Sequence, residues 1–166
     1  MNVEIQDYLN FSLDEGTIKF PRKLLFSDYS CAKPFKIIDL RGWILSEGVF
    51  PCLATENDAL YILILDHSQG WNLHDLQSLR GHPSLKRLPL AKAPCKIDRN
   101  FAEMLGSFPS LLHLNLSNNK LESGVCNALS TTCKSLRSIN LSKCSIVDNY
   151  SLHALASCIG RFRSLE

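Results

Sequence analysis

The stretch that decides the fold is Leu111-Leu112-His113-Leu114-Asn115-Leu116-Ser117-Asn118-Asn119-Lys120-Leu121. It matches the spacing L-x-x-L-x-L-x-x-N-x-L at every position, with Asn119 as the asparagine. The pattern returns from Leu136 to Ile146, where Cys144 takes the asparagine position. Side chains two residues apart lie on the same side of a strand. The spacing therefore predicts short strands whose apolar sides stack on the equivalent residues of neighbouring units.

The same spacing continues toward the N-terminus at intervals of 25 or 26 residues. The five unit starts are Phe35, Leu60, Leu85, Leu111 and Leu136. A sixth unit is expected to begin at Leu165, since Ser164-Leu165-Glu166 parallels Ser135-Leu136-Arg137. Residues 35–166 are therefore predicted to be repeats, and residues 1–34 to cover the exposed end of their core.

This pattern resembles that of the leucine-rich repeat family over residues 35–166. The resemblance implies an α/β solenoid with a curved parallel sheet on its concave face and helices on its convex face. From Leu111 onward the units are similar to the ribonuclease-inhibitor and cysteine-containing subtypes. The second likeness is carried by Cys133-Lys134-Ser135-Leu136 together with Leu141, Cys144, Ile146 and Asp148. Less regular turns are expected in the early units, because the asparagine position holds in turn Trp43, Ser68, Ala93, Asn119 and Cys144.

Helices are predicted between the strands, where apolar residues recur three and four positions apart. The predicted ranges are Asp98 to Leu105, Val125 to Leu129 and Leu152 to Ile159, with Gly106 and Gly160 as stops. Pro89 has no N–H to donate, so a local distortion is expected in the third strand. Trp43 and Trp71 are expected to pack in the core or at its edge.

The second, third, fifth, seventh and eighth positions of each unit are expected to face away from the core. Across five units they hold seven basic and two acidic residues, a net charge of +5 against +2 for the whole chain. A basic concave surface would attract acidic partners, whereas an ordinary solvated face is the alternative. The residues expected to contact a protein partner are Arg41, Tyr61, Ile64, Asp66, Lys86, Arg87, Lys92, His113, Arg137 and Lys143.

Other functional classes find little support in the sequence. It contains no G-x-S-x-G, P-loop, G-x-G-x-x-G or H-E-x-x-H motif, so no enzyme, cofactor or metal site is predicted. Asp66, His67 and Cys95 could be imagined as a nucleophile set, but Cys95 falls at an inward or turn position. The chain has no apolar run of the roughly 18–20 residues that span a membrane. Its basic positions are not interleaved with aromatic residues, which argues against nucleic acid.

The seven cysteines are an odd number and form no C-x-x-C pair. The segment from Met1 to Gln6 is polar and does not resemble a secretory signal. These features favour reduced thiols in an intracellular protein, either cytoplasmic or nuclear.

The N-terminal segment is similar to that of the ZYG/ZER substrate receptors of cullin–RING ubiquitin ligases. In both, a Leu-Asn-Phe-like stretch (Leu9-Asn10-Phe11) precedes a Phe-Pro segment (Phe20-Pro21) and then leucine-rich repeats. The adaptor-binding helix of that family has a cysteine where this chain has Tyr8. The resemblance implies that residues 5–13 bind a ligase adaptor and the repeats bind a substrate. A scaffold whose N-terminal segment serves only as a cap is the other interpretation.

The last six residues, 161–166, begin a repeat without a polar cap to close the core. Solenoids need such a cap for solubility. We therefore expect either a longer horseshoe of which this chain is the N-terminal part, or a partner that covers this end.

Overall fold

The computed structural model describes residues 36–45, 48–56, 58–146, 153 and 164–165, and it consists of strands and helices in alternation. The strands are β1 (Ile37–Asp39), β2 (Ile62–Ile64), β3 (Arg87–Pro89), β4 (His113–Asn115), β5 (Lys120–Leu121), β6 (Ser138–Asn140), β7 (Ser145–Ile146) and β8 (Ser164–Leu165). The helices are α1 (Val49–Glu56), α2 (Leu73–Gln77), α3 (Arg99–Leu105) and α4 (Val125–Thr132). Within these ranges no helix is long and apolar enough to cross a bilayer.

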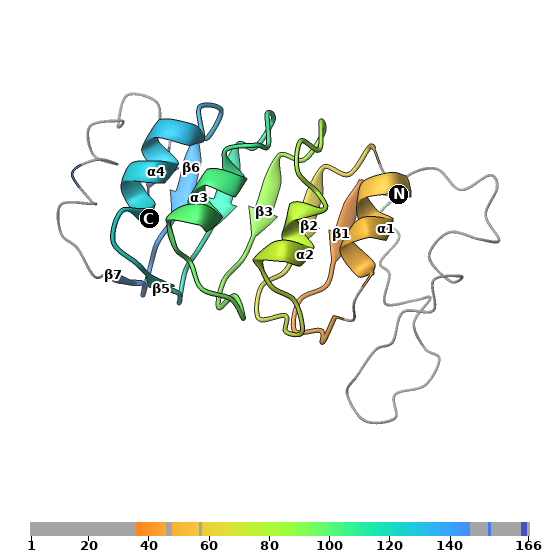
Figure 1. The fold of residues 1–166 in the computed structure, drawn as a ribbon, viewed down its shortest axis with the longest axis horizontal. Coiled ribbons are helices and arrows are strands. Elements are labelled where there is room, and N and C mark those ends of the chain that lie inside the picture. The colour runs from red at the N-terminus through yellow and green to blue at the C-terminus, as the bar shows by residue number, and fades with distance from the viewer. Residues whose placement is uncertain (1–35, 46–47, 57, 147–152, 154–163, 166) are drawn as a thin grey trace.

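The main sheet is parallel and follows the order of the chain, β1-β2-β3-β4-β6-β8. Helices α1 to α4 form a row along one side of it (Figure 1). Equivalent positions pair directly across successive units, as with Ile38 and Leu63, or Leu114 and Ile139. This arrangement confirms the predicted solenoid, in which each unit is covered by its neighbours.

The residues predicted to face the core do so in every described unit. The first, fourth and sixth positions are almost fully buried in the three central units and the fifth: Leu60, Leu63, Leu65, Leu85, Leu88, Leu90, Leu111, Leu114, Leu116, Leu136, Ile139 and Leu141. Ile38 and Leu40 fill the corresponding places in the first unit. Burial of each such side chain is worth about 2 kcal/mol relative to exposure, so these rows form the main stabilising element.

The start of the sixth unit was predicted wrongly. Leu165 pairs with Ile139 rather than with Leu136, so it occupies the fourth position of its unit and not the first. Counting back three residues places the first position at Phe162, an interval of 26 residues from Leu136. That interval equals the spacing of the other units, whereas the predicted start required a longer one. Hydrogen bonding to β6 fixes the register more strictly than the match of Ser-Leu dipeptides.

Pro89 affects the pairing of its strand on one side only. Strand β3 continues through Pro89, whose carbonyl accepts a hydrogen bond from the Leu65 N–H at 2.9 Å. The register between β3 and β4 extends over three pairs, but that between β2 and β3 is formed by Ile62 and Arg87 alone. The missing N–H therefore shortens the ladder toward β2 without ending the strand.

The helices begin and end close to the predicted residues. Asp98 caps α3, and its Oδ1 accepts the Phe101 N–H at 2.9 Å. Asn72 and Asp75 form a reciprocal capping box on α2. The predicted helix from Leu152 to Ile159 lies outside the described residues, apart from His153. The small parallel pair of β5 and β7 was not predicted from the spacing.

The turns after the strands share one backbone conformation, contrary to the expectation of less regular early units. The eighth residue has a positive φ in all five units: Gly42, His67, Lys92, Asn118 and Lys143. The eighth N–H also donates to the seventh carbonyl of the next unit wherever that unit is described in full, as from Gly42 to Asp66 at 3.0 Å. Because this ladder joins neighbouring units through the backbone, it holds the turn whatever residue follows.

Candidate functional site

The candidate site is the side of the main sheet that faces away from the helices, which we call the strand face. It consists of the second, third and fifth positions of each unit, bordered by the eighth positions in the turns. The third positions form a row of paired residues from Ile37 through Ile62, Arg87 and His113 to Ser138. The face therefore changes from apolar at β1 and β2 to polar at β6.

An apolar patch lies at the N-terminal end of the strand face. It consists of Ile37, Tyr61, Ile62 and Ile64. Ile37 is 38% exposed and Tyr61 is 39% exposed, which places them among the three most exposed large apolar side chains of the described residues. Ile37 pairs with Ile62, so the patch continues across two strands. Neighbouring apolar side chains that remain open to water are typical of interaction sites.

Cationic side chains lie beside this patch and at the centre of the face. The Lys86 ammonium lies 4.9 Å from the centroid of the Tyr61 ring, a cation–π contact. Arg87 is exposed, and its backbone pairs with that of His113 on β4. The sequence prediction that Tyr61, Lys86, Arg87 and His113 share one face is consistent with these positions.

Two of the predicted contact residues are engaged within their own repeats. Arg41 and Asp39 form an exposed ion pair with a 2.5 Å separation of Nη2 and Oδ2, and this raises the pKa of Arg41. Asp66 is half-buried, and its Oδ1 accepts the Ala91 N–H at 2.6 Å. Both acidic residues are thus partly neutralised, and Asp66 has a structural role in the turn of the next unit.

The remaining predicted cations lie along the borders of the strand face. Lys92 and Lys143 are exposed in the turns, at eighth positions. Arg137 is half-buried, and its Nη1 donates to the carbonyls of Lys134 and Leu136 at 3.3 and 3.1 Å. The positive charge is therefore concentrated at the edges, while Arg87 is the central cation of the described face.

Two positions expected to face outward are buried. Ala91 is 5% exposed and Ser117 is 7% exposed, both at seventh positions. The alternation of a strand no longer holds there, because the chain has already entered the turn and its carbonyls accept hydrogen bonds from the preceding unit. The usable surface is accordingly narrower than the sequence predicted.

Asn119 has a structural role that extends beyond its own unit. Its side chain is buried, and Nδ2 donates to the carbonyls of Leu90 and Leu116 at 2.9 and 2.8 Å. Its Oδ1 accepts the Ala93 N–H at 2.9 Å. Asn119 thus serves the preceding unit, where Ala93 occupies the asparagine position and cannot form these bonds. This alanine is the signal in the sequence that could have revealed the shared role.

Other polar residues replace the asparagine elsewhere. The Ser68 hydroxyl donates to the Leu65 carbonyl and accepts from Trp71 Nε1, both at 2.7 Å. Trp71 is buried and lies against Phe50, and Trp43 packs on the same core, as predicted for both tryptophans. Cys144 Sγ donates to the Leu116 carbonyl at 3.0 Å. Hydrogen bonding by these different side chains explains why the turns are regular.

The imagined nucleophile set does not have the required chemistry. Burial raises the pKa of the Cys95 thiol to about 12, so a thiolate is disfavoured at neutral pH. Burial also raises the pKa of Cys144. Cys126 and Cys133 are buried in the core. Among the described residues, no group of three or more His, Cys, Asp or Glu side chains could hold a metal ion.

His113 gives the strand face a pH dependence with a defined sign. Burial and the nearby charge of Arg87 lower its pKa from the ordinary 6.5. The unfolded chain therefore takes up this proton more readily, so the stability contributed by neutral His113 is present above pH 6.5 and declines as the pH falls below it. We expect the His113→Gln variant to lose less stability than the wild type between pH 7.5 and pH 5.5 in urea titrations. His74→Gln, on the exposed side of α2, is the control, and an equal pH slope for wild type and His113→Gln would contradict the prediction.

The repeating strand, left-handed turn and helix together define a leucine-rich repeat solenoid. No protein-family model and no curated protein matches the sequence. Solved structures with the same fold include an internalin (inlF) from Listeria monocytogenes, which is 19% identical with a TM-score of 0.56 over 80% of this chain and 34% of that one. A second is the TLR13–ssRNA13 complex, which is 23% identical with a TM-score of 0.56 over 79% of this chain and 18% of that one. The chain thus spans about a third or less of the length of these structures.

Proposed function

We propose that this chain is a non-enzymatic protein-interaction module whose strand face binds a partner protein through an acidic segment with apolar side chains. The observation that carries the proposal is the apolar patch of Ile37, Tyr61, Ile62 and Ile64. Equivalent inward side chains are almost fully buried, whereas Ile37 and Tyr61 each leave more than a third of their surface in water. Tyrosine beside aliphatic residues is a frequent composition of binding hot spots.

The charges around the patch support an acidic partner. Lys36, Lys86 and Arg87 surround it, while Asp39 is already paired with Arg41. Carboxylates of a partner would gain from these cations, and the long-range attraction would increase the association rate. The edge residues Lys92 and Lys143 extend the positive charge beyond the patch.

Charge reversal separates binding by this face from binding elsewhere. We expect Arg87→Glu to reduce the affinity for a captured partner about tenfold or more, because it places a carboxylate opposite acidic groups. Partners are first captured by affinity purification with mass spectrometry, and the dissociation constant is then measured with the purified pair. Tyr61→Ala is expected to weaken the same complex by removing the aromatic contact.

The matched control is Arg80→Glu, which makes the same change at an exposed arginine in the turn after α2. It is expected to leave the affinity within about twofold of wild type, as rim and remote charges usually do. Equal losses from Arg80→Glu and Arg87→Glu would overturn the assignment of binding to the strand face.

A second candidate function is substrate recognition within a cullin–RING ubiquitin ligase. It is favoured by Leu9-Asn10-Phe11 and Phe20-Pro21, which precede the repeats in the order that the ZYG/ZER receptors have. Both segments lie outside the described residues, and the likeness is one of sequence. Purified elongin or Skp-type adaptors should be retained by the full chain under this candidate, and loss of retention on Leu9→Ala with Phe11→Ala would locate the contact. Failure of either adaptor to bind the wild-type chain would remove this candidate.

A further inference from the structure

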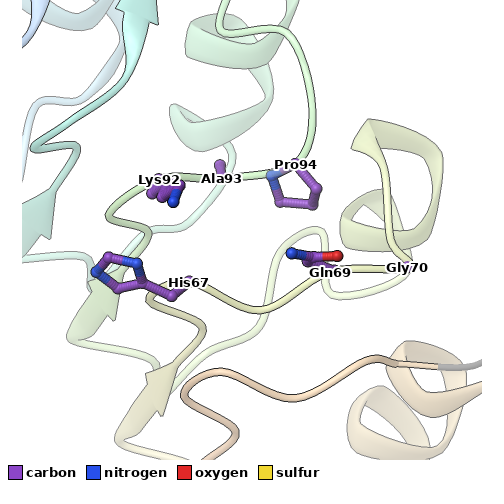
Figure 2. A pocket seen from close by; sticks show the side chains of 6 residues that line it. All are labelled: His67, Gln69, Gly70, Lys92, Ala93 and Pro94. Carbon is purple, nitrogen blue, oxygen red and sulfur yellow. The ribbon is translucent and has the colours of Figure 1, made fainter. Parts of the chain in front are cut away.

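A hollow lies at the edge of the strand face, between the turns of the second and third units. It has a volume of about 310 Å³ and is lined by His67, Gln69, Gly70, Lys92, Ala93 and Pro94. Figure 2 shows the side chains of His67 and Lys92 at one end of this edge hollow, with Gln69 and Pro94 at the other. The hollow is large enough for one side chain of a bound protein.

Its two nitrogen-bearing side chains stand where they are conformationally costly. His67 has a φ of 59° and Lys92 a φ of 52°, in the left-handed region that disfavours side chains by about 1–2 kcal/mol. Glycine occupies the equivalent place in the first unit, at Gly42. Residues with donor groups at strained positions point to a functional use of those groups.

The positive charge of Lys92 has no compensating carboxylate in the described part of the chain. The ion pairs found there are Arg41 with Asp39, Lys96 with Glu122, and Arg99 with Glu103. Asp66, next to His67 in the sequence, bonds through its carboxylate to the Ala91 N–H. A carboxylate entering the hollow would therefore meet an ammonium group that is available for pairing.

The backbone donors around the hollow are already used. The N–H groups of His67 and Lys92 donate to the carbonyls of Ala91 and Ser117, and that of Gln69 donates to the Trp43 carbonyl. The Ala93 N–H is bound by Asn119. Recognition in the hollow must therefore come from side chains. These are an ammonium, an imidazole and a carboxamide, with Ala93 and Pro94 as apolar walls.

We infer that the edge hollow is the anchor site for one acidic side chain, glutamate or aspartate, of the protein that binds the strand face, and this rests on the proposed function. The carboxylate would accept hydrogen bonds from Lys92 Nζ and from an imidazole N–H of His67. The methylene groups would pack on Pro94. A phosphate is a poorer fit, because the hollow offers no arginine to grip its oxygens in pairs.

Selection of displayed random dodecapeptides on the full 166-residue chain tests this inference. We expect the enriched peptides to share one acidic residue at a fixed distance from apolar residues. Changing that glutamate to glutamine in a synthetic peptide should weaken binding to wild type about tenfold, as expected for loss of a charged hydrogen bond. The same change should have almost no effect on binding to Lys92→Asn, because the carboxylate has already lost its partner there.

The control is Lys143→Asn, the same substitution at the equivalent turn position outside the hollow. Asparagine tolerates the left-handed conformation, so both variants should keep the fold. Enriched peptides without a shared acidic residue, or an equal effect of the glutamine change on wild type and Lys92→Asn, would overturn the anchor site alone. Absence of enrichment, or binding insensitive to Tyr61→Ala and Arg87→Glu, would overturn the proposed function together with it.

Discussion

Gly70→Ala is expected to lower the free energy of unfolding by about 3–5 kcal/mol, the largest effect of any single methyl group added to this chain. Gly70 has a φ of +78°, and a Cβ there would overlap the Leu45 carbonyl oxygen and approach the Leu45 N at 3.2 Å. Both atoms belong to the backbone of the preceding unit, where the Leu45 N–H bonds to the Gln69 carbonyl at 2.8 Å. Relief would require the two units to separate.

Gly81→Ala is a closely matched control for this prediction. Gly81 has the same φ of +78°, but a Cβ at this position meets nothing within 4 Å. Its loss should be about 1–2 kcal/mol, which is the conformational cost alone. Urea denaturation followed by circular dichroism gives both values. If Gly70→Ala loses no more stability than Gly81→Ala, the contact between the first two units is not as tight as described.

Asn119→Ala is expected to destabilise the protein by about 3 kcal/mol, because several buried polar groups lose their partner at once. The carbonyls of Leu90, Leu116 and Ser117 lose the amide of Asn119, and the Ala93 N–H loses its acceptor. Asn119→Asp should cost at least as much, since a carboxylate cannot donate to the three carbonyls and would carry its charge into a buried site.

Asn127→Ala provides the comparison for Asn119→Ala. Asn127 is exposed on α4, and alanine is the better helix former, so this variant should be neutral or slightly stabilised. Hydrogen exchange adds a local measurement, because loss of Asn119 should reduce protection in the third and fourth units together. A variant that loosens the fourth unit alone would contradict the shared role of Asn119.

The sequence by itself determined which side chains form the core. Leu63, Leu88, Leu114 and Ile139 follow a spacing that any chain in short strands must turn to one side, and all four are buried as predicted. The same reasoning located the helix capped by Asp98. It failed at Leu165, where a short dipeptide match suggested a register that the hydrogen bonds to β6 do not follow.

Only the tertiary structure decided which outward residues are available for binding. The spacing treats Arg41, Arg87 and Arg137 alike, yet Arg41 is paired with Asp39, Arg137 bonds to nearby backbone carbonyls, and Arg87 is exposed. The edge hollow and the double role of Asn119 likewise arise from residues about 25 positions apart. Local periodicity fixes the direction of a side chain relative to its own strand. Its partners depend on the neighbouring unit, which only the packed solenoid brings into contact.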